Sequence, residues 1–183
     1  MRIAALTVGV LSFATPALAG QFTLFSPDVA DGGTLPMKQV YNQFGCTGDD
    51  ISPALEWSGA PAGTKSFAVT VFDPDAPTGS GWWHWVVVNI PSYIHSLRTG
   101  AGAVKSDALP KGAVQARDDY GVSGFGGACP PKGDKPHHYI FTVYALKVAH
   151  LPVKATTTGA MASYLIHGDM LAKASITATY GRP

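Results

Sequence analysis

Short runs of hydrophobic residues recur along this chain, and most of them are rich in β-branched or aromatic side chains. Runs of this kind, bounded by turn residues, are typical of β-strands. The 21 glycines and 14 prolines divide the chain between the runs, which favours an all-β core. The pattern predicts strands over residues 21–26, 65–72, 82–90, 138–148 and 174–180.

One segment, residues 156–173, has helical rather than alternating spacing. Thr156 to Thr158 offer an N-cap at its start. The residues that recur at helical spacing along it are Ala160, Tyr164, His167 and Leu171. The sequence therefore predicts a mainly β fold, a β-sandwich with one appreciable helix near its C-terminus.

The first 19 residues have the pattern of an export signal. One cation, Arg2, precedes an apolar stretch through Phe13, and Ala-Leu-Ala at 17–19 fits a signal peptidase site. The apolar stretch is shorter than the roughly 20 residues of a membrane-spanning helix. We therefore expect cleavage after Ala19, a single domain over residues 20–183, no transmembrane segment after cleavage, and a periplasmic or secreted location.

Charge and cysteine usage narrow the classes of partner. The chain has 13 Lys and Arg against 12 Asp and Glu, and removal of Arg2 balances them. A neutral chain without a basic run is a poor binder of nucleic acid or anionic membranes.

In an oxidising compartment, Cys46 and Cys129 allow one disulfide, and the alternative is that each is a small buried residue.

Long irregular stretches over residues 45–64 and 99–136 separate the predicted strands. Loops of this length in a compact domain are usually functional. The second ends in GFGGACPPKGDKPHH, whose glycines and paired prolines suit a defined turn that walls a pocket.

The segment DPDAP, residues 73–77, follows the second predicted strand. Asp73 and Asp75 are two residues apart, so in extended backbone both side chains point to the same side. Pro74 and Pro77 stiffen the segment. The alternative is a strand end that enters a turn, with aspartates that accept backbone N–H groups.

His84 lies in the third predicted strand, on the expected face of Val86, Val88 and Ile90, with Trp83 and Trp85 on the other face. An imidazole on an apolar face needs a hydrogen-bond partner. A nearby carboxylate would fix its tautomer, raise its pKa and leave the other nitrogen to donate to an anion. The alternative partner is a backbone carbonyl.

A second polar pair, His137 and Tyr139, shares one face of the fourth predicted strand with Phe141, while His138 faces away. The two groups form one site only if their strands converge. The candidate constellation is Asp73, Asp75, His84, His137 and Tyr139.

Three chemistries could use this constellation. A serine nucleophile has weak support, because there is no G-x-S-x-G motif and Ser123 has no local activating group. Two histidines and a carboxylate can hold a metal, but H-x-H, H-E-x-x-H and C-x-x-C spacings are absent. The third is a pocket for a small anion or zwitterion, with glycine-rich backbone and histidine donors and with carboxylates that orient them or face a cationic group of the ligand. No metal or other cofactor is expected.

DPDAPTGSGWWHWVVVNIP and GACPPKGDKPHHYIFTVYAL together resemble the two signature regions of the phosphatidylethanolamine-binding proteins, also called Raf kinase inhibitor proteins, in their bacterial branch. The resemblance spans nearly the whole mature chain. It implies a β-sandwich of two antiparallel sheets with short peripheral helices and a small pocket near one end for phosphate, phosphoryl head groups or similar anions. The implied pocket residues are Asp73, Asp75, His84, Pro130, Pro131, His137 and Tyr139.

The chain departs from the family pattern at two positions. The family has H-R-Y where His137, His138 and Tyr139 stand, which puts a salt bridge of that arginine in doubt. Asp50 stands where the bacterial branch has asparagine, which affects a loop hydrogen bond.

The resulting prediction is an exported, non-enzymatic binding protein. Its pocket accepts a phosphoryl or carboxylate group from a small anion, a phospholipid head group or a partner protein. A metal-dependent or acid/base hydrolase that uses the same cluster is the alternative. A third reading is a protein inhibitor whose loops 45–64 and 99–136 contact a partner.

Overall fold

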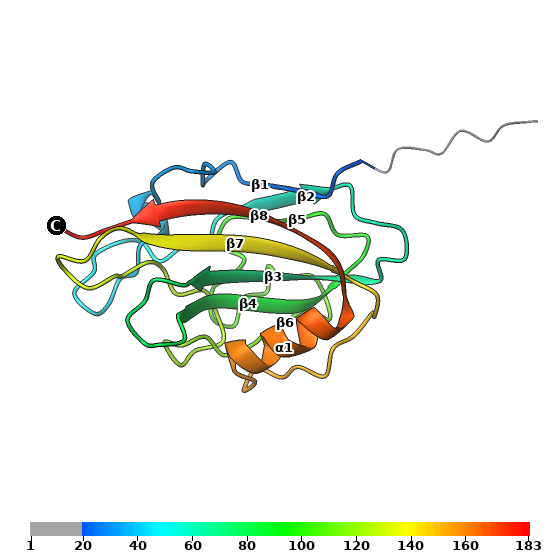
Figure 1. The fold of residues 1–183 in the computed structure, drawn as a ribbon. Coiled ribbons are helices and arrows are strands. Elements are labelled where there is room, and N and C mark those ends of the chain that lie inside the picture. The colour runs from blue at the N-terminus through cyan, green and yellow to red at the C-terminus, as the bar shows by residue number, and fades with distance from the viewer. Residues whose placement is uncertain (1–19) are drawn as a thin grey trace, which may run out of the picture.

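Two antiparallel sheets and one α-helix form the fold of residues 20–183, which are the residues that this computed structural model describes (Figure 1). The leader expected over residues 1–19 lies outside the described residues. The smaller sheet has the order β1-β2-β5, with β1 at Thr23–Phe25, β2 at Leu55–Ser58 and β5 at Ser96–Leu97. The larger sheet has the order β6-β4-β3-β7-β8, with β3 at Ser66–Asp73, β4 at Trp82–Pro91, β6 at Val114–Gln115, β7 at His137–Leu146 and β8 at Met170–Tyr180. The helix α1 covers Gly159–Asp169, and a 3-10 turn covers Met37–Gln39.

Two hydrophobic cores join the layers, one on each face of the larger sheet. The core between the sheets includes Leu55, Trp57, Phe67, Val69, Val71 and Phe141. The core between the larger sheet and α1 includes Ala68, Val86, Leu146, Ala162 and Ile166. Because β3 is covered on both faces, its sequence is a nearly continuous apolar run rather than an alternation. The predicted β-sandwich with one appreciable helix is confirmed.

All five predicted strands are present, although their ends differ by several residues. The sequence pattern does not reveal β2, β5 and β6, which have two to four residues; β1 is as short but lies within the longer predicted run over residues 21–26. β2 lies within the stretch 45–64 and β6 within 99–136, both of which were predicted as irregular.

The helix is shorter at its C-terminal end than predicted. Thr158 is its N-cap, as the sequence indicates, but the helix ends at Asp169 and β8 begins at Met170 without a loop. Leu171 therefore belongs to a strand and not to the helical face. The backbone of β8 pairs with β7 from Met170 onward, and this long-range ladder outweighs the local helical spacing.

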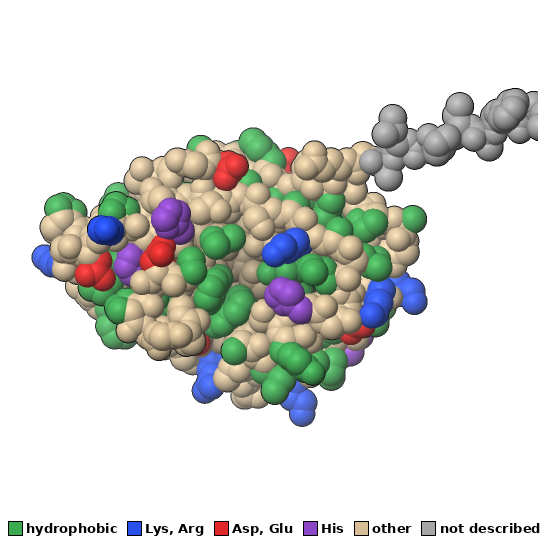
Figure 2. Space-filling view, in the orientation of Figure 1, with side chains coloured by type: hydrophobic (Ala, Val, Ile, Leu, Met, Phe, Trp, Pro, Cys, Tyr) green, Lys and Arg blue, Asp and Glu red, His purple; other side chains and the backbone are tan. Residues whose placement is uncertain are grey.

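The antiparallel order brings the polar ends of three strands together. The end of β3 lies beside the start of β4, with Asp73 paired to Trp82, and β7 begins on the other side of β3. These strand ends lie at the left of Figure 1, near the C-terminus. Figure 2 shows histidine, acidic and basic side chains gathered at the same end of the molecule. The condition that the two polar groups converge is therefore met.

Candidate functional site

A cavity of about 290 Å³ opens where these strand ends meet. Its walls are mainly aromatic rings and prolines, with a small number of titratable groups among them. The lining residues are Phe44, Asp73, Ala76, Pro77, Thr78, Trp82, His84, Tyr120, Cys129, Pro130, Pro131, His137, Tyr139 and Arg182. Six of the seven predicted pocket residues are in this set, and Asp75 is not.

Asp73 links the loop after β3 to the start of β7. Its Oδ1 accepts the backbone N–H groups of Asp75 at 2.8 Å and Ala76 at 3.1 Å, while its Oδ2 accepts from His137 Nδ1 at 2.7 Å. The backbone after Asp73 therefore turns, and the prediction that Asp73 and Asp75 point to the same side of an extended segment is wrong. The alternative reading, a strand end whose aspartate accepts backbone N–H groups, holds for Asp73.

Asp75 pairs with His138 outside the cavity. Its Oδ2 accepts from the backbone N–H and from Nδ1 of His138, both at 2.7 Å. The backbone hydrogen bond lowers the pKa of Asp75, and the imidazole acts in the same direction. The histidine that stands in place of the family's arginine thus has a carboxylate partner of its own.

A β-bulge places His84 at the cavity. Val71 pairs with Trp85 and Phe72 with Trp83, so His84 is an extra residue in β4. Trp83 packs against the core beneath α1, whereas Trp85 lies in the core between the sheets. The prediction that both tryptophans share a face is wrong, because the bulge shifts the phase of the alternation.

A second irregularity breaks the predicted row from His84 to Ile90. Val88 lies in the core beneath α1 and Ile90 in the core between the sheets, with Asn89 between them at a left-handed φ of 61°. Side chains beyond Asn89 therefore change faces relative to a regular strand.

The ring of His84 is held by backbone and not by a carboxylate. Its Nδ1 lies 2.7 Å from the carbonyl oxygen of Gly126, and because a carbonyl only accepts, Nδ1 carries the proton. Gly126 N–H donates back to the carbonyl of His84 at 2.8 Å. Burial lowers the pKa of His84, although Gly126 and the Asp73 carboxylate act to raise it. The predicted carboxylate partner and raised pKa are wrong for His84, and the alternative backbone partner is present.

Glycine at 126 permits Tyr120 and Asp118 to approach the backbone closely. A Cβ atom there would stand 2.3 Å from Tyr120 Cδ2 and 3.1 Å from Asp118 Oδ2. The Tyr120 hydroxyl in turn donates to the carbonyl of Gly127 at 3.0 Å. The glycine pair thus supports one wall of the cavity through its backbone.

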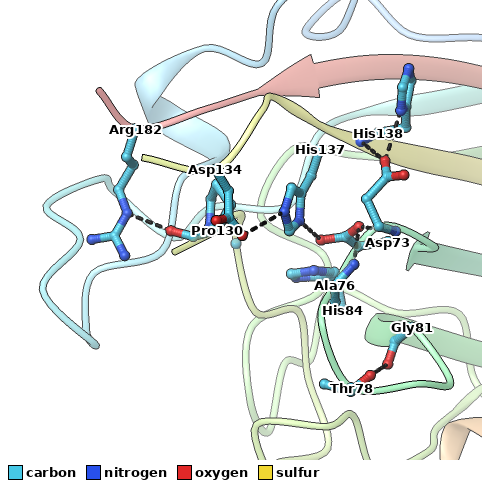
Figure 3. A network of polar contacts seen from close by, with 12 residues as sticks. Asp73, Ala76, Thr78, Gly81, His84, Pro130, Asp134, His137, His138 and Arg182 are labelled. Carbon is cyan, nitrogen blue, oxygen red and sulfur yellow. Dashed lines mark hydrogen bonds and ion pairs between the residues drawn. The ribbon is translucent and has the colours of Figure 1, made fainter. Parts of the chain in front are cut away.

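Of the two histidines that line the cavity, His137 is the one that a carboxylate orients (Figure 3). Asp73 and His137 are 3 % and 4 % exposed, so their contact is shielded from water. On the other side of the ring, Nε2 lies 3.5 Å from Oδ2 of Asp134, whose side chain is 44 % exposed at the rim. The imidazole therefore stands between a buried and an accessible carboxylate.

Three buried polar atoms in the cavity wall have no hydrogen-bond partner among residues 20–183. They are Trp82 Nε1, His84 Nε2 and Tyr139 Oη. Burial raises the pKa of Tyr139, so its hydroxyl stays protonated and can donate. An unpaired buried polar group costs about 1–3 kcal/mol, which a bound ligand would offset.

The rim joins segments that are far apart in sequence. Arg182 donates from Nε to the carbonyl of Pro130 at 2.6 Å and from Nη1 to that of Gly45 at 3.1 Å. Cys46 and Cys129 form a disulfide beside these contacts, with Cα atoms 6.0 Å apart. Sequence reasoning missed Arg182, and no local signal marks it, because it follows the last strand far from both motifs.

Two further aspartates lie beside the glycine pair: Asp50, for which the sequence predicts an effect on a loop hydrogen bond, and Asp118, which sequence reasoning missed. Asp50 Oδ1 accepts the N–H of Gly127 at 2.7 Å, and burial raises the pKa of Asp50. Asp118 Oδ1 accepts the N–H of Val122 at 2.8 Å, and burial raises the pKa of Asp118 to about 7. The asparagine-to-aspartate departure at position 50 thus keeps an acceptor for the loop.

The described part of the chain offers no cluster of three or more His, Cys, Asp or Glu side chains arranged to hold a metal ion. Within residues 20–183, no helix is both long enough and apolar enough to span a membrane.

The chain as a whole has relatives among known proteins. Residues 25–181 match the family model described as phosphatidylethanolamine-binding protein. The chain is 54 % identical to the UPF0098 protein YbcL of Escherichia coli over 172 residues, which cover 93 % of this chain and 94 % of YbcL. It is 52 % identical to the UPF0098 protein YbhB of the same species over 157 residues, or 86 % of this chain and 98 % of YbhB.

A solved structure and a more distant relative extend the comparison. The crystal structure of YbcL, described as a new member of the mammalian PEBP family, matches with a TM-score of 0.88 at 52 % identity and covers 90 % of this chain and 100 % of that one. A Mycobacterium tuberculosis relative that bears the name "Putative lipoprotein LppC" is 36 % identical over 167 residues, or 91 % of this chain and 76 % of LppC.

Proposed function

The chain belongs to the phosphatidylethanolamine-binding protein family, and from this membership we propose that it is an exported binding protein whose cavity takes a phosphoryl or carboxylate group. Membership supports a protein that binds a small ligand. The observation that carries the anionic ligand is the pair of unpaired buried donors, Trp82 Nε1–H and Tyr139 O–H. Acceptor oxygens of a ligand would satisfy both donors.

Charge at the rim supports the same ligand. Two nitrogens of the Arg182 guanidinium donate to the carbonyls of Pro130 and Gly45, which holds this cation at the mouth of the cavity. A fixed guanidinium attracts phosphoryl and carboxylate groups. Within the site, Asp73 orients His137 and shapes the loop, so its carboxylate is already engaged by hydrogen-bond donors.

The size of the cavity supports a ligand of head-group dimensions. Its volume of about 290 Å³ lies near the lower end of small-molecule sites, roughly 300–1,000 Å³. The aromatic side chains of Trp82 and Tyr120 would contact the part of the ligand that carries the anionic group. They would also attract an ammonium group in that part through a cation–π interaction. A phospholipid head group has this chemistry, and so does the same head group as a free phosphate ester.

Export and a protein partner complete the proposal. The leader pattern in the sequence, the disulfide and the name of the mycobacterial relative LppC support a location outside the cytoplasm. A protein partner would contact residues 45–64 or 99–136. Loss of its binding on substitution of exposed residues there, with ligand affinity unchanged, would test that part.

Hydrolysis is the competing function, and the Asp73–His137 pair is the feature that favours it. The pair has the arrangement of a general base with its orienting carboxylate. Among the cavity residues, however, the Thr78 hydroxyl donates to the carbonyl of Gly81 at 2.6 Å and Cys129 is disulfide-bonded, so neither is activated by His137. Turnover of p-nitrophenyl phosphate that disappears in His137→Ala would favour the hydrolase.

Calorimetric titration with inorganic phosphate and O-phosphoethanolamine tests the proposed binding function. We expect saturable binding that falls about tenfold, or ~1.4 kcal/mol, in Asp73→Ala, because His137 and the loop lose their common anchor. Asp75→Ala is the matched control, because the Asp75 carboxylate lies outside the cavity. The affinity of this variant for the ligand should stay within about threefold of the wild-type value. Absence of heat with both ligands would contradict the proposed binding function. Unchanged affinity in Asp73→Ala would contradict the role of Asp73 in orienting His137.

A further inference from the structure

The hydrogen-bond polarity of the unpaired atoms restricts the ligand more narrowly than size does. Trp82 Nε1–H can only donate, and the Tyr139 hydroxyl is a free donor. His84 differs, because its Nδ1–H is committed to the carbonyl of Gly126. Its Nε2 therefore has a free lone pair without a partner, in a residue that lines the cavity. The buried wall thus combines two donors with one acceptor.

The surroundings of His84 maintain this tautomer. The titratable and charged groups around the ring are Asp73 on β3, His137 and Tyr139 on β7, and Asp118, Asp119 and Tyr120 between β6 and β7. Asp73 and Asp119 act to raise the pKa of His84, but burial outweighs them and lowers it. Burial also raises the pKa of both tyrosines, which therefore stay neutral.

We propose that the cavity binds a phosphoryl group that carries one proton, and that it takes phosphomonoesters in preference to phosphodiesters. This inference rests on the proposed function and defines the ligand class of the same site. Two oxygens of the monoanion accept from Trp82 and Tyr139, and its P–OH donates to His84 Nε2. A phosphodiester has no P–OH, so the lone pair of His84 would face an oxygen that also only accepts.

The charges around the cavity favour the monoanion independently. The buried carboxylate of Asp73 repels a second negative charge in the cavity. Among the described residues that line the cavity, Arg182 is the only lysine or arginine. The Asp134 carboxylate, also at the rim, disfavours a second negative charge on the ligand further.

The proton requirement predicts the pH dependence of affinity. A phosphomonoester loses its second proton with a pKa of about 6 in water. Above that pH the free ligand is mainly dianionic, so the complex contains one more proton than its separated components. Affinity therefore falls as pH rises, by about 50-fold between pH 6 and pH 8, because the binding-competent fraction falls by that factor.

O-phosphoethanolamine and glycerophosphoethanolamine are matched probes, because they share the ethanolamine group and differ in the P–OH. We would titrate each into the purified protein at pH 6 and pH 8, in two buffers of different ionisation enthalpy. At pH 6 the monoester should bind at least about tenfold more tightly. At pH 8 its affinity should be about 50-fold lower than at pH 6, with uptake of about one proton.

Equal or tighter binding of the diester at pH 6, or monoester affinity that does not change with pH, would overturn the inference alone. Binding of neither probe would contradict the proposed function and the inference with it. The nitrogen NMR spectrum of His84 at pH 7 is an additional check on the free protein: a protonated Nε2 would also overturn the inference.

Three variants separate the role of His84 from that of the other contacts. His84→Asn has an amide that can donate and does not titrate, so we expect the preference for the monoester to fall below about threefold. Trp82→Phe removes one donor and should weaken the monoester while proton uptake remains. His138→Gln lies outside the cavity and should preserve both preference and pH dependence. If His84→Asn folds and keeps the full preference for the monoester, the role of His84 is overturned. If His84→Asn does not fold, loss of proton uptake in Trp82→Phe would overturn that role instead.

Discussion

Burial changes the pKa values of His84 and Asp118 in opposite directions, because it penalises whichever form is charged. It lowers the pKa of the imidazole and raises that of the carboxyl to about 7. Both side chains lie against Gly126, one through a hydrogen bond and the other by close approach. Burial thus favours the neutral form of both side chains.

Asp118 should make the stability of the protein decrease as pH rises. Between about pH 4 and pH 7 the unfolded state has released the proton that folded Asp118 retains, so the penalty grows through this window and is complete above pH 7. Asp118→Asn keeps an oxygen for the N–H of Val122 and never ionises. We expect its stability relative to wild type to improve by about 2 kcal/mol between pH 5 and pH 8.

Urea unfolding of both proteins at the two pH values measures this difference. Asp107→Asn, at an exposed carboxylate, is the control and should show no comparable change. An Asp118→Asn gain that is equal at pH 5 and pH 8 would show that the carboxyl is not titrating within this window.

At the scale of elements, irregular strands and short connections position the functional groups. The bulge in β4 turns His84 toward the cavity. Trp83 before it packs against the core beneath α1, and Trp85 after it packs into the core between the sheets. α1 continues directly into β8, whose end leads to Arg182 at the rim. Bulges occur often beside functional sites because they re-aim one side chain without ending the sheet.

The N-cap of α1 gives a prediction at this scale. The Thr158 side chain accepts the N–H of Met161 at 3.3 Å, which satisfies one of the free donors at the helix start. Thr158→Ala should lower the free energy of unfolding by about 1 kcal/mol. Thr156→Ala, at an exposed position before the cap, is the matched control and should change it by less than about 0.5 kcal/mol. Equal midpoints for all three proteins in urea would contradict the capping role.

At the scale of the whole molecule, the rim is assembled from distant parts of the chain. The disulfide joins residues 83 positions apart, and Arg182 bridges the carbonyls of Gly45 and Pro130 on its two sides. These links hold the segment before β2 against the segment before β7. The mouth of the cavity is thus a product of chain topology.

Removal of the disulfide should destabilise the whole fold. Closing a loop of this length restricts the unfolded chain by an amount equivalent to about 4–5 kcal/mol, and measured effects are usually smaller, so we expect a loss of about 2–4 kcal/mol in Cys46→Ser/Cys129→Ser. Dithiothreitol should lower the urea midpoint of the wild type and leave that of the double variant unchanged. A wild-type midpoint insensitive to reduction would contradict the prediction.

Local patterns in the sequence determined the longer strands, the start of the helix and six of the residues that line the cavity. Apolar runs located β3, β4 and β7, and the polar residues at their ends included Asp73, His84 and His137. These features depend on residues close together in the chain, where periodicity and turn chemistry act. The count of two cysteines likewise allowed the disulfide but did not decide it.

Only the tertiary structure decided the partners. His84 bonds to a carbonyl 42 residues away, Asp73 to an imidazole 64 residues away and Arg182 to a carbonyl 52 residues away. The phase of β4 was also decided here, because a bulge is set by the register with β3 and leaves no mark in the alternation itself. Hydrogen-bond partners, and with them the direction of each pKa shift, depend on which distant groups are brought into contact and on how much water is excluded, and neither is a property of the local sequence.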